Sequence, residues 1–274
     1  MSYGDIGPWS EIKLDIIREY ASAYSQILDA QRGIEHLYID AFAGSGVHIS
    51  RLTGKFVLGS PLNALLVDPP FKEYHLIDIE RDKAASLRRI VGERPDVWIY
   101  EGGCNKILLA DVLPRAKYED YKRALCLLDP CGLHLNWNLI ETTGQMKSID
   151  IFLNFPIEDM NRNVLRRNSE NVDSKQAQRM TAYWGDETWH EAAYVKTPTL
   201  FGSDWDIKKT NEAIAKAFRA RLKDIAGFAH VPEPIPMRNS MGAILYYLFF
   251  ASQKPVAATI VRDIFKKYRG KGGS

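Results

Sequence analysis

Acidic side chains and glycines stand where the apolar runs of this sequence end, and such groups could bind or position a ligand. The first run ends in Asp40-Ala-Phe-Ala-Gly-Ser-Gly46. Two glycines in such a turn allow the backbone to approach a ligand closely. The loop matches neither GxGxxG nor the GK[ST] of a phosphate-binding loop, which disfavours NAD and ATP as ligands. A tight strand-to-helix turn without a ligand would show the same residues.

A second carboxylate, Asp78, ends the next apolar run and is followed by Ile79 and Glu80. In dinucleotide-binding folds, a carboxylate at this place accepts hydrogen bonds from the hydroxyls of a ribose. Asp40 and Asp78 are 38 residues apart, whereas the usual unit has about 20, so we expect an insertion near 49–61. A helix with an N-cap Asp and a first-turn Glu would fit the same residues.

The third run is followed by Glu101-Gly-Gly-Cys-Asn105, a loop that we expect to flank an adenine. Asn105 could hydrogen-bond to a base edge, and Cys104 could pack against the base. Asn105 would look the same if it served only as a helix cap.

A carboxylate and a rigid turn, Asp129-Pro130, follow the fourth run in Leu128-Asp-Pro-Cys-Gly-Leu-His134. Asp129 could orient an amine or hydroxyl nucleophile. Asp, Pro and Gly also favour turns that have no function, so a capped turn is the alternative.

The fifth run ends in Asn154-Phe-Pro156, where Phe155 could stack on a base and Asn154 could donate a hydrogen bond to it. A strand-end turn imposed by Pro156 is the alternative. Basic and aromatic residues follow: Arg162, Arg166, Arg167, Trp184 and Trp189. This composition is typical of a nucleic-acid groove, and an ordinary solvated pair of helices has it too.

The elements that must position these residues alternate between strands and helices, which predicts crossover units and a parallel sheet. We expect strands at 36–42, 74–79, 96–100, 124–129 and 149–155, and two more at 228–237 and 243–251. Helices are expected at 10–28, capped by Ser10, and at 81–91, 106–116, 208–225 and 256–268. Residues 157–205 predict a helical insertion after the fifth strand. The whole chain, 1–274, is therefore expected to be one α/β domain with a seven-stranded sheet and helices on both faces.

Composition and charge narrow the class of protein. The chain has 274 residues, 46% hydrophobic and 26% charged, which is ordinary for a globular protein. The longest apolar run, 241–251, is about half of the ~20 residues that span a bilayer, and no secretory signal is recognisable, so we expect a cytoplasmic protein without membrane contact. Three cysteines without a CxxC pair fit a reducing compartment and predict no metal site.

The formal net charge of +2 is unevenly distributed. The segment from Lys254 to Ser274 has six basic residues and one acid, a net of +5, which leaves −3 for the other 253 residues. This basic C-terminal tail could be a solubilising helix end, or it could contact phosphates.

The motifs together resemble the Rossmann-like S-adenosylmethionine-dependent methyltransferases and, more narrowly, the family of three-Cys-motif partner proteins (TcmP). The resemblance rests on the loops after Asp40, Asp78 and Asp129, and it covers nearly the whole chain. Further blocks that look like those of the family are Trp9-Ser-x-x-Lys13-Leu, Gly59-Ser-Pro-Leu62, Asp150-Ile-Phe-Leu-Asn-Phe-Pro156 with Asn161-Arg162, and Tyr247-Leu-Phe-Phe-Ala-Ser252. The family's name refers to a neighbouring cysteine-motif protein, so Cys104, Cys126 and Cys131 are not that motif.

The resemblance implies S-adenosylmethionine as the cofactor and a three-Cys-motif protein as a partner. By motif position, the cofactor-binding residues would be Asp40, Ala41, Phe42, Gly44, Gly46, Asp78, Ile79, Gly103, Cys104, Asn105 and Asp129. Gly103 departs from the acidic residue that many such proteins carry beside the adenine. Asp129, Pro130, Asn154 and Phe155 would form the catalytic group.

A second motif, Asp68-Pro-Pro-Phe71, matches the D-P-P-[FYW] pattern of amino-group methyltransferases. It precedes the second strand and should therefore lie at the amino edge of the sheet, where we interpret it as a turn. Asp129-Pro130 occupies the position at which that catalytic motif normally stands.

Three functions remain open from these residues. The first is a methyltransferase acting on a nucleic acid or nucleotide, with Arg162, Arg166, Arg167 and the basic tail contacting phosphates. The second is a non-catalytic partner of a three-Cys-motif protein of the radical or iron–sulfur type, in DNA repair or phage-linked functions. The third is a metal-dependent nuclease that uses Asp40, Asp78 and Asp129, which would leave the glycine loop unexplained.

Overall fold

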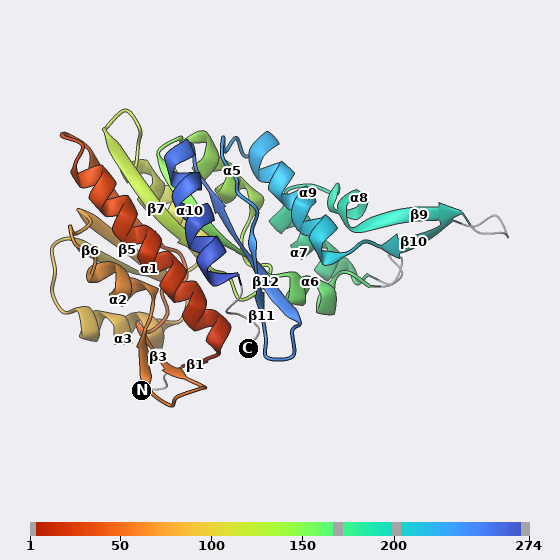
Figure 1. Cartoon of the computed structure of the whole chain (residues 1–274), viewed down its shortest axis with the longest axis horizontal. Helices are drawn as coiled ribbons and strands as arrows, with labels where there is room; N and C mark the ends of the chain where they lie inside the picture. The colour runs from red at the N-terminus through yellow and green to blue at the C-terminus, as the bar shows by residue number, and fades with distance from the viewer. Residues whose placement is uncertain (1–3, 167–171, 199–203, 270–274) are drawn as a thin grey trace.

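A computed structural model describes residues 4–166, 172–198 and 204–269 of the chain. In this part, a seven-stranded sheet with the order β11-β12-β8-β7-β2-β5-β6 is flanked by helices on both faces (Figure 1). Its strands are β2 (Glu35–Asp40), β5 (Glu73–Asp78), β6 (Val97–Glu101), β7 (Lys122–Leu128), β8 (Ile149–Phe155), β11 (Ile235–Arg238) and β12 (Ile244–Ala251). Strand β12 alone in this sheet runs antiparallel to both of its neighbours. This topology confirms the predicted Rossmann-like methyltransferase fold.

Two layers of helices cover the faces of the sheet. One face carries α1 (Pro8–Asp29), α2 (Ser60–Leu65), α3 (Arg81–Val91) and α10 (Pro255–Tyr268). The other carries α4 (Cys104–Ile107), which continues into a π-helical segment (Leu108–Val112) and a 3-10 turn (Leu113–Arg115), together with α5 (Trp137–Gln145), α7 (Ser174–Trp184) and α9 (Asn211–Asp224).

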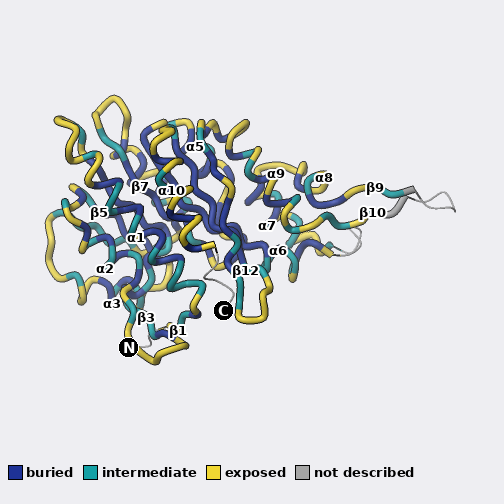
Figure 2. Tube along the Cα trace, in the orientation of Figure 1, coloured by how far each residue is buried: buried dark blue, intermediate teal, exposed yellow. Residues whose placement is uncertain are grey.

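The two cores follow from the alternation of side chains along each strand. In β2, Leu37 and Ile39 belong to the core on the α5 and α9 side, and Tyr38 belongs to the core on the α1 side. All three side chains are buried. Figure 2 shows the central strands buried along most of their length, with exposed residues at the loops and helix surfaces.

Helix α1 begins earlier than the sequence predicts. Its N-cap is Gly7, and Pro8 is the first helical residue, whereas we expected Ser10 to cap it. Proline suits this position because the first helical N–H has no partner within the helix. The backbone N–H of Ser10 donates to the Gly7 carbonyl at 2.9 Å instead.

The expected insertion between β2 and β5 forms a small sheet and a helix. Strands β3 (Val47–Ser50) and β4 (Phe56–Leu58) make a hairpin, and β1 (Gly4–Ile6) adds to it in parallel with β3. Helix α2 follows and returns the chain to the main sheet. The extra residues between Asp40 and Asp78 are thereby explained.

The segment after β8 contains a feature that we did not expect from the sequence. It has the helices α6 (Ile157–Asn163), α7 and α8 (Trp189–Ala193), but it ends in an antiparallel pair, β9 (Tyr194–Pro198) and β10 (Asp204–Lys208). Figure 1 shows this pair extending away from the body of the protein. No helix among the described residues is long and apolar enough to cross a membrane.

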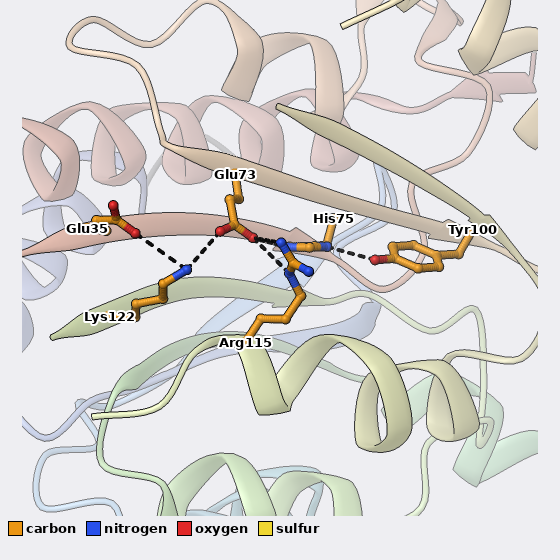
Figure 3. A network of polar contacts seen from close by, with 6 residues as sticks. All are labelled: Glu35, Glu73, His75, Tyr100, Arg115 and Lys122. Atoms are coloured by element: carbon orange, nitrogen blue, oxygen red, sulfur yellow. Dashed lines mark hydrogen bonds and ion pairs between the residues drawn. The ribbon is translucent and has the colours of Figure 1, made fainter. Parts of the chain in front are cut away.

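A partly buried ionic network lies at the amino edge of the sheet (Figure 3). Glu73, at the start of β5, accepts from Lys122 Nζ at 2.8 Å and from Arg115 Nε at 2.9 Å. His75 Nε2 lies 3.1 Å from the same carboxylate, and its Nδ1 lies 3.0 Å from the Tyr100 hydroxyl. The network therefore links β5, β6 and β7 at the edge opposite to the loops that follow these strands.

Burial and hydrogen bonds move the pKa values of this network in defined directions. Burial opposes ionisation of Glu73, but hydrogen bonds from Lys122, Arg115 and His75 outweigh it and lower its pKa to about 2. Burial lowers the pKa of His75 to about 4, although Glu73 acts in the opposite direction. At neutral pH the network thus holds an ionised Glu73 beside a neutral His75.

We expect Glu73→Gln to lower the free energy of unfolding by about 2 kcal/mol at pH 7, because the Glu73 carboxylate is only 12% exposed and its loss leaves the partly buried Lys122 and the exposed Arg115 without their shared counter-charge. The wild-type carboxylate stabilises the fold above pH 4.5, and this contribution is lost as pH falls toward its folded pKa of about 2. The difference between variant and wild type should therefore shrink over that range. Urea denaturation at pH 7, 4.5 and 3 measures it.

The matched control is Glu35→Gln, because Glu35 contacts the same Lys122 at 3.4 Å but its side chain is 51% exposed. An exposed partner contributes below about 1 kcal/mol. Equal destabilisation by the two variants at pH 7 would contradict the role assigned to Glu73.

Candidate functional site

The candidate site lies at the carboxyl edge of the parallel strands, where the open α/β sheets bind their ligands. Strands β2, β5, β7 and β8 bring Asp40, Asp78, Asp129 and Asn154 to this edge. Because β12 is antiparallel, its beginning lies at the same edge, next to the end of β8.

The glycine loop after β2 is held in place by Asp78. Gly44 has a φ of +66°, and its N–H donates to Asp78 Oδ2 at 2.8 Å. Gly46 has a φ of +86°, and a Cβ there would lie 2.9 Å from Leu87 Cδ1. Gly46 is therefore required by backbone conformation and by packing on α3, while a Cβ on Gly44 would meet one atom, of His48, at 3.9 Å.

Asp78 presents its carboxylate between two loops. Its other oxygen, Oδ1, accepts from the Glu80 N–H at 2.8 Å, so each oxygen holds one backbone donor. Each carboxylate oxygen has a second lone pair that a ligand hydroxyl can use. The neighbouring Ile79 is 73% exposed, and a Cβ on Gly103 would meet open space. A carboxylate between an exposed aliphatic side chain and an open glycine fits a nucleoside.

Asp40 and Ala41 do not face the site as we expected. The Asp40 carboxyl is fully buried, and it accepts from the Phe42 N–H at 3.2 Å and from the Tyr38 hydroxyl at 3.3 Å. Burial raises its pKa to about 6. Ala41 is 2% exposed. Asp40 and Ala41 are therefore buried beneath the glycine loop, whereas Phe42 and Gly44 are partly exposed on its surface.

Asn105 and Cys104 likewise have structural partners. The Asn105 amide donates to the His134 carbonyl and accepts from the Asn136 N–H, both at 2.9 Å. Cys104 is 6% exposed, and burial raises the pKa of its thiol to about 11. In this structure the Asn105 amide joins the loop after β6 to the segment that leads into α5.

A buried ion pair stands at the end of β7. Lys13 of α1 reaches across to Asp129 Oδ2, and the two side chains are 10% and 22% exposed. Burial alone would lower the pKa of Lys13, but the charge of Asp129 outweighs it and keeps the pKa above its ordinary value. The Lys13 ammonium is therefore charged at neutral pH and lies beside the Asp129 carboxylate.

Asn154 completes this cluster from β8. Its Nδ2 donates to Asp129 Oδ1 at 2.9 Å. Its Oδ1 is buried and has no hydrogen-bond partner among the described residues. A buried acceptor without a donor is costly in a folded protein, so Asn154 is suited to a ligand that carries an N–H or O–H group.

A cavity of about 680 Å³ opens directly beside this Lys13–Asp129–Asn154 cluster. Its lining comes from α1, the two strand ends, α6, the turn before β12 and the start of β12: Trp9, Ser10, Lys13, Asp129, Pro130, Cys131, Asn154, Pro156, Glu158, Asp159, Arg162, Asn163, Asn239, Leu245 and Tyr246. Its size is within the range of about 300–1,000 Å³ that small-molecule sites occupy.

Phe155 does not reach the cavity, contrary to our expectation. It is fully buried, and its ring centroid lies 4.5 Å from that of Phe218 in α9. Adjacent residues of a strand point to opposite faces, so Asn154 and Phe155 cannot both face one ligand.

The basic and aromatic residues after β8 are only partly available. Arg162 lines the cavity, with its side chain 73% exposed and paired with Glu158 at 2.5 Å. Arg166 is exposed, and Arg167 lies outside the described residues. Trp184 and Trp189 are 2% and 0% exposed, so both belong to the core and the aromatic half of the predicted groove is wrong.

Lys13 is the site residue that sequence reasoning did not assign a role. It lies on the stripe of α1 that continues through the buried Ile16, Ile17, Tyr20 and Tyr24. A cation at an apolar position of an amphipathic helix needs a buried partner. The position of Lys13 on the apolar face could therefore have predicted a buried ion pair with Asp129 or another carboxylate.

Among the described residues, no group of three or more His, Cys, Asp or Glu side chains could hold a metal ion. Asp40, Asp78 and Asp129 each have the separate partners given above. The nuclease hypothesis therefore finds no set of ligands in this part of the chain.

Comparison with known proteins supports only the fold. No protein-family model and no curated protein matches this chain. A Legionella pneumophila protein of the family model DUF519 is 11% identical, with a TM-score of 0.52 over 95% of this chain and 94% of its own. A candidate S-adenosylmethionine-dependent methyltransferase from Listeria monocytogenes is 12% identical, with a TM-score of 0.42 over 85% of this chain and 100% of its own. The first of these likenesses shows a shared fold.

Proposed function

We propose that this protein is an S-adenosylmethionine-dependent methyltransferase that acts on a nucleic acid or nucleotide, and that it belongs with the three-Cys-motif partner proteins. The observation that carries the proposal is the ion-paired Asp129, held by Lys13 and Asn154 at the mouth of the 680 Å³ cavity. The nucleoside-suited loop around Asp78 lies at the same edge of the sheet.

The residues available to hold the methyl donor are those of three loops. Asp78 would bind the ribose hydroxyls, Ile79 and Gly103 would flank the base, and Phe42 with Gly44 would border the methionine part. When bound, S-adenosylmethionine supplies a methyl group attached to a positively charged sulfur. Methyl transfer depends mainly on alignment of the reacting atoms, so a small number of positioning groups is sufficient.

The Lys13–Asp129–Asn154 cluster orients the acceptor. The free lone pairs of Asp129 accept a hydrogen bond from an amino or hydroxyl group of the methyl acceptor. This hydrogen bond fixes the direction in which the lone pair of the acceptor nitrogen or oxygen points. Lys13 pairs with Asp129 Oδ2 and Asn154 Nδ2 donates to Asp129 Oδ1, so both carboxylate oxygens are held in place. The unpartnered Oδ1 of Asn154 offers a second acceptor for the same group.

Two measurements test the proposal. Isothermal titration calorimetry with S-adenosylmethionine and its demethylated product should show saturable binding at one site. Incubation with methyl-labelled S-adenosylmethionine and pooled DNA, RNA or nucleotides should then transfer label to one pool. Absence of donor binding would overturn the proposal.

One observation favours the alternative of a non-catalytic partner. The protruding β9–β10 pair places Val195 opposite Ile207, and these side chains are 48% and 52% exposed. Adjacent exposed aliphatic residues are typical of protein contact surfaces. Donor binding without transfer to any pool, together with loss of co-purification of a three-Cys-motif protein in Val195→Ser/Ile207→Ser, would support this role.

A further inference from the structure

A second concave surface, separate from the 680 Å³ cavity beside the Lys13–Asp129–Asn154 cluster, carries a concentration of positive charge. It has a volume of about 660 Å³ and is formed by α9, the segment 229–233 and α10. We refer to it as the basic cleft. Its charged residues are Arg219, Lys223, Arg262, Lys266, Arg269 and Glu233.

The charge of the basic cleft exceeds that of the whole protein. Five cations and one carboxylate give a net of +4, whereas the full chain has a net of +2. The residues outside the cleft therefore sum to −2. Clustered like charges destabilise a compact fold and attract counter-ions. Such a concentration of cations is therefore typical of a surface that binds a polyanion.

Most of these cations have no carboxylate partner. Arg219 donates to the Val231 carbonyl at 2.7 Å and pairs with Glu233, which fixes it against the floor of the cleft. Arg262 Nε donates to the Ala258 carbonyl at 3.1 Å within its helix. Within the described part of the chain, Lys223, Lys266 and Arg269 form no ion pair. Four of the five cations are thus available to an incoming anion.

The spacing of the cations fits a nucleic-acid strand. Arg262, Lys266 and Arg269 follow one face of α10 and cover about 10 Å along its axis. One strand of a duplex carries about three phosphates over that length. Lys223 adds a cation from α9 to the lining of the same cleft. The buried Val231 and Phe265 offer no apolar surface of the kind that inserts into a membrane.

We propose that the basic cleft between α9 and α10 binds the phosphodiester backbone of a nucleic acid. As a second contact for the methyl acceptor this inference rests on the proposed function, but backbone binding itself requires no methyl donor. It assigns a place to part of the basic C-terminal tail, because Arg262, Lys266 and Arg269 form one wall.

The test compares two triple variants of equal charge change. Lys223→Gln/Arg262→Gln/Lys266→Gln removes cations from the cleft. Arg32→Gln/Lys55→Gln/Lys117→Gln removes three exposed cations elsewhere. Fluorescence anisotropy with labelled single- and double-stranded oligonucleotides, at increasing salt and without methyl donor, measures affinity and its salt dependence.

We expect the cleft variant to reduce the slope of log affinity against log salt by about 2–3, since each phosphate contact contributes about 0.9 on duplex and 0.7 on single strands. The control variant should change it by less than about one. Lys266→Glu should weaken binding more than Lys266→Gln does. Both triple variants should retain the wild-type circular dichroism spectrum, because all six substituted residues are exposed. Arg262 also donates to the Ala258 carbonyl within its helix.

Three outcomes would overturn the inference: no oligonucleotide binding by the wild type at low salt, equal loss in the two triple variants, or binding to phosphatidylserine vesicles but not to oligonucleotides. The first would leave the proposed methyltransferase intact if calorimetry still shows donor binding. Conversely, oligonucleotide binding without donor binding would support the cleft and overturn the methyltransferase.

Discussion

Asp129→Asn should reduce methyl transfer by about 10²–10⁴-fold, the range over which positioned acid–base groups contribute to catalysis. The substitution keeps the shape of the side chain and its contact with Asn154, but it removes the charge that directs the acceptor. Because Asp78 is unchanged, the affinity of the variant for S-adenosylmethionine should remain within about threefold of the wild-type value. Such a change corresponds to the loss of at most one weak contact between residue 129 and the donor. Initial rates with the labelled pool and calorimetry with the donor provide the two numbers.

A fold defect must be separated from a defect in catalysis. Asp129→Asn leaves Lys13 buried without a counter-charge, and an unpaired buried charge costs about 3–5 kcal/mol. The double variant Lys13→Met/Asp129→Asn removes both charges and should recover much of that stability without recovering transfer. If the double variant regains more than about one tenth of the wild-type rate, the assignment of Asp129 is wrong.

Asp78→Ala should weaken binding of S-adenosylmethionine by more than tenfold. A hydrogen bond to a charged group is worth about 1.5–3 kcal/mol, and a difference of 1.4 kcal/mol is already tenfold. The variant also removes the acceptor of the Gly44 N–H, which holds the glycine loop. Both effects reduce affinity for the donor, and calorimetry measures the sum.

Asp68→Ala is the matched control for this experiment. Asp68 belongs to the second Asp-Pro motif, in the segment that leads into β5, where the Lys72 N–H bonds to the His36 carbonyl at the amino end of β2. This location confirms the predicted amino edge. Donor affinity should stay within about twofold of wild type, since surface changes away from a site have small effects. A large loss in Asp68→Ala, or unchanged affinity in folded Asp78→Ala, would place the donor elsewhere.

The sequence by itself determined the seven strands of the main sheet, their order in the chain and the edge at which the functional residues gather. Apolar runs of strand length separated by helical stretches predict a parallel sheet, and parallel strands end at a common edge. Asp78, Asp129 and Asn154 could therefore be placed near one another without coordinates. The β9–β10 pair was missed because each strand is only five residues long, so that the alternation of polar and apolar residues in Asp204-Trp-Asp-Ile-Lys208 is a brief signal within a segment interpreted as helical.

The tertiary structure decided which side chains meet. Lys13 and Asp129 are 116 residues apart, and no local pattern encodes that α1 crosses the end of β7. The same holds for Phe155, which the pleat turns into the core, and for Asn105, whose amide joins two loops. The basic cleft likewise exists because the tertiary fold brings residues of α9, the segment 229–233 and α10 to one concave surface. Periodicity fixes the face on which a residue lies, but the partner on that face depends on long-range packing that a single sequence does not show.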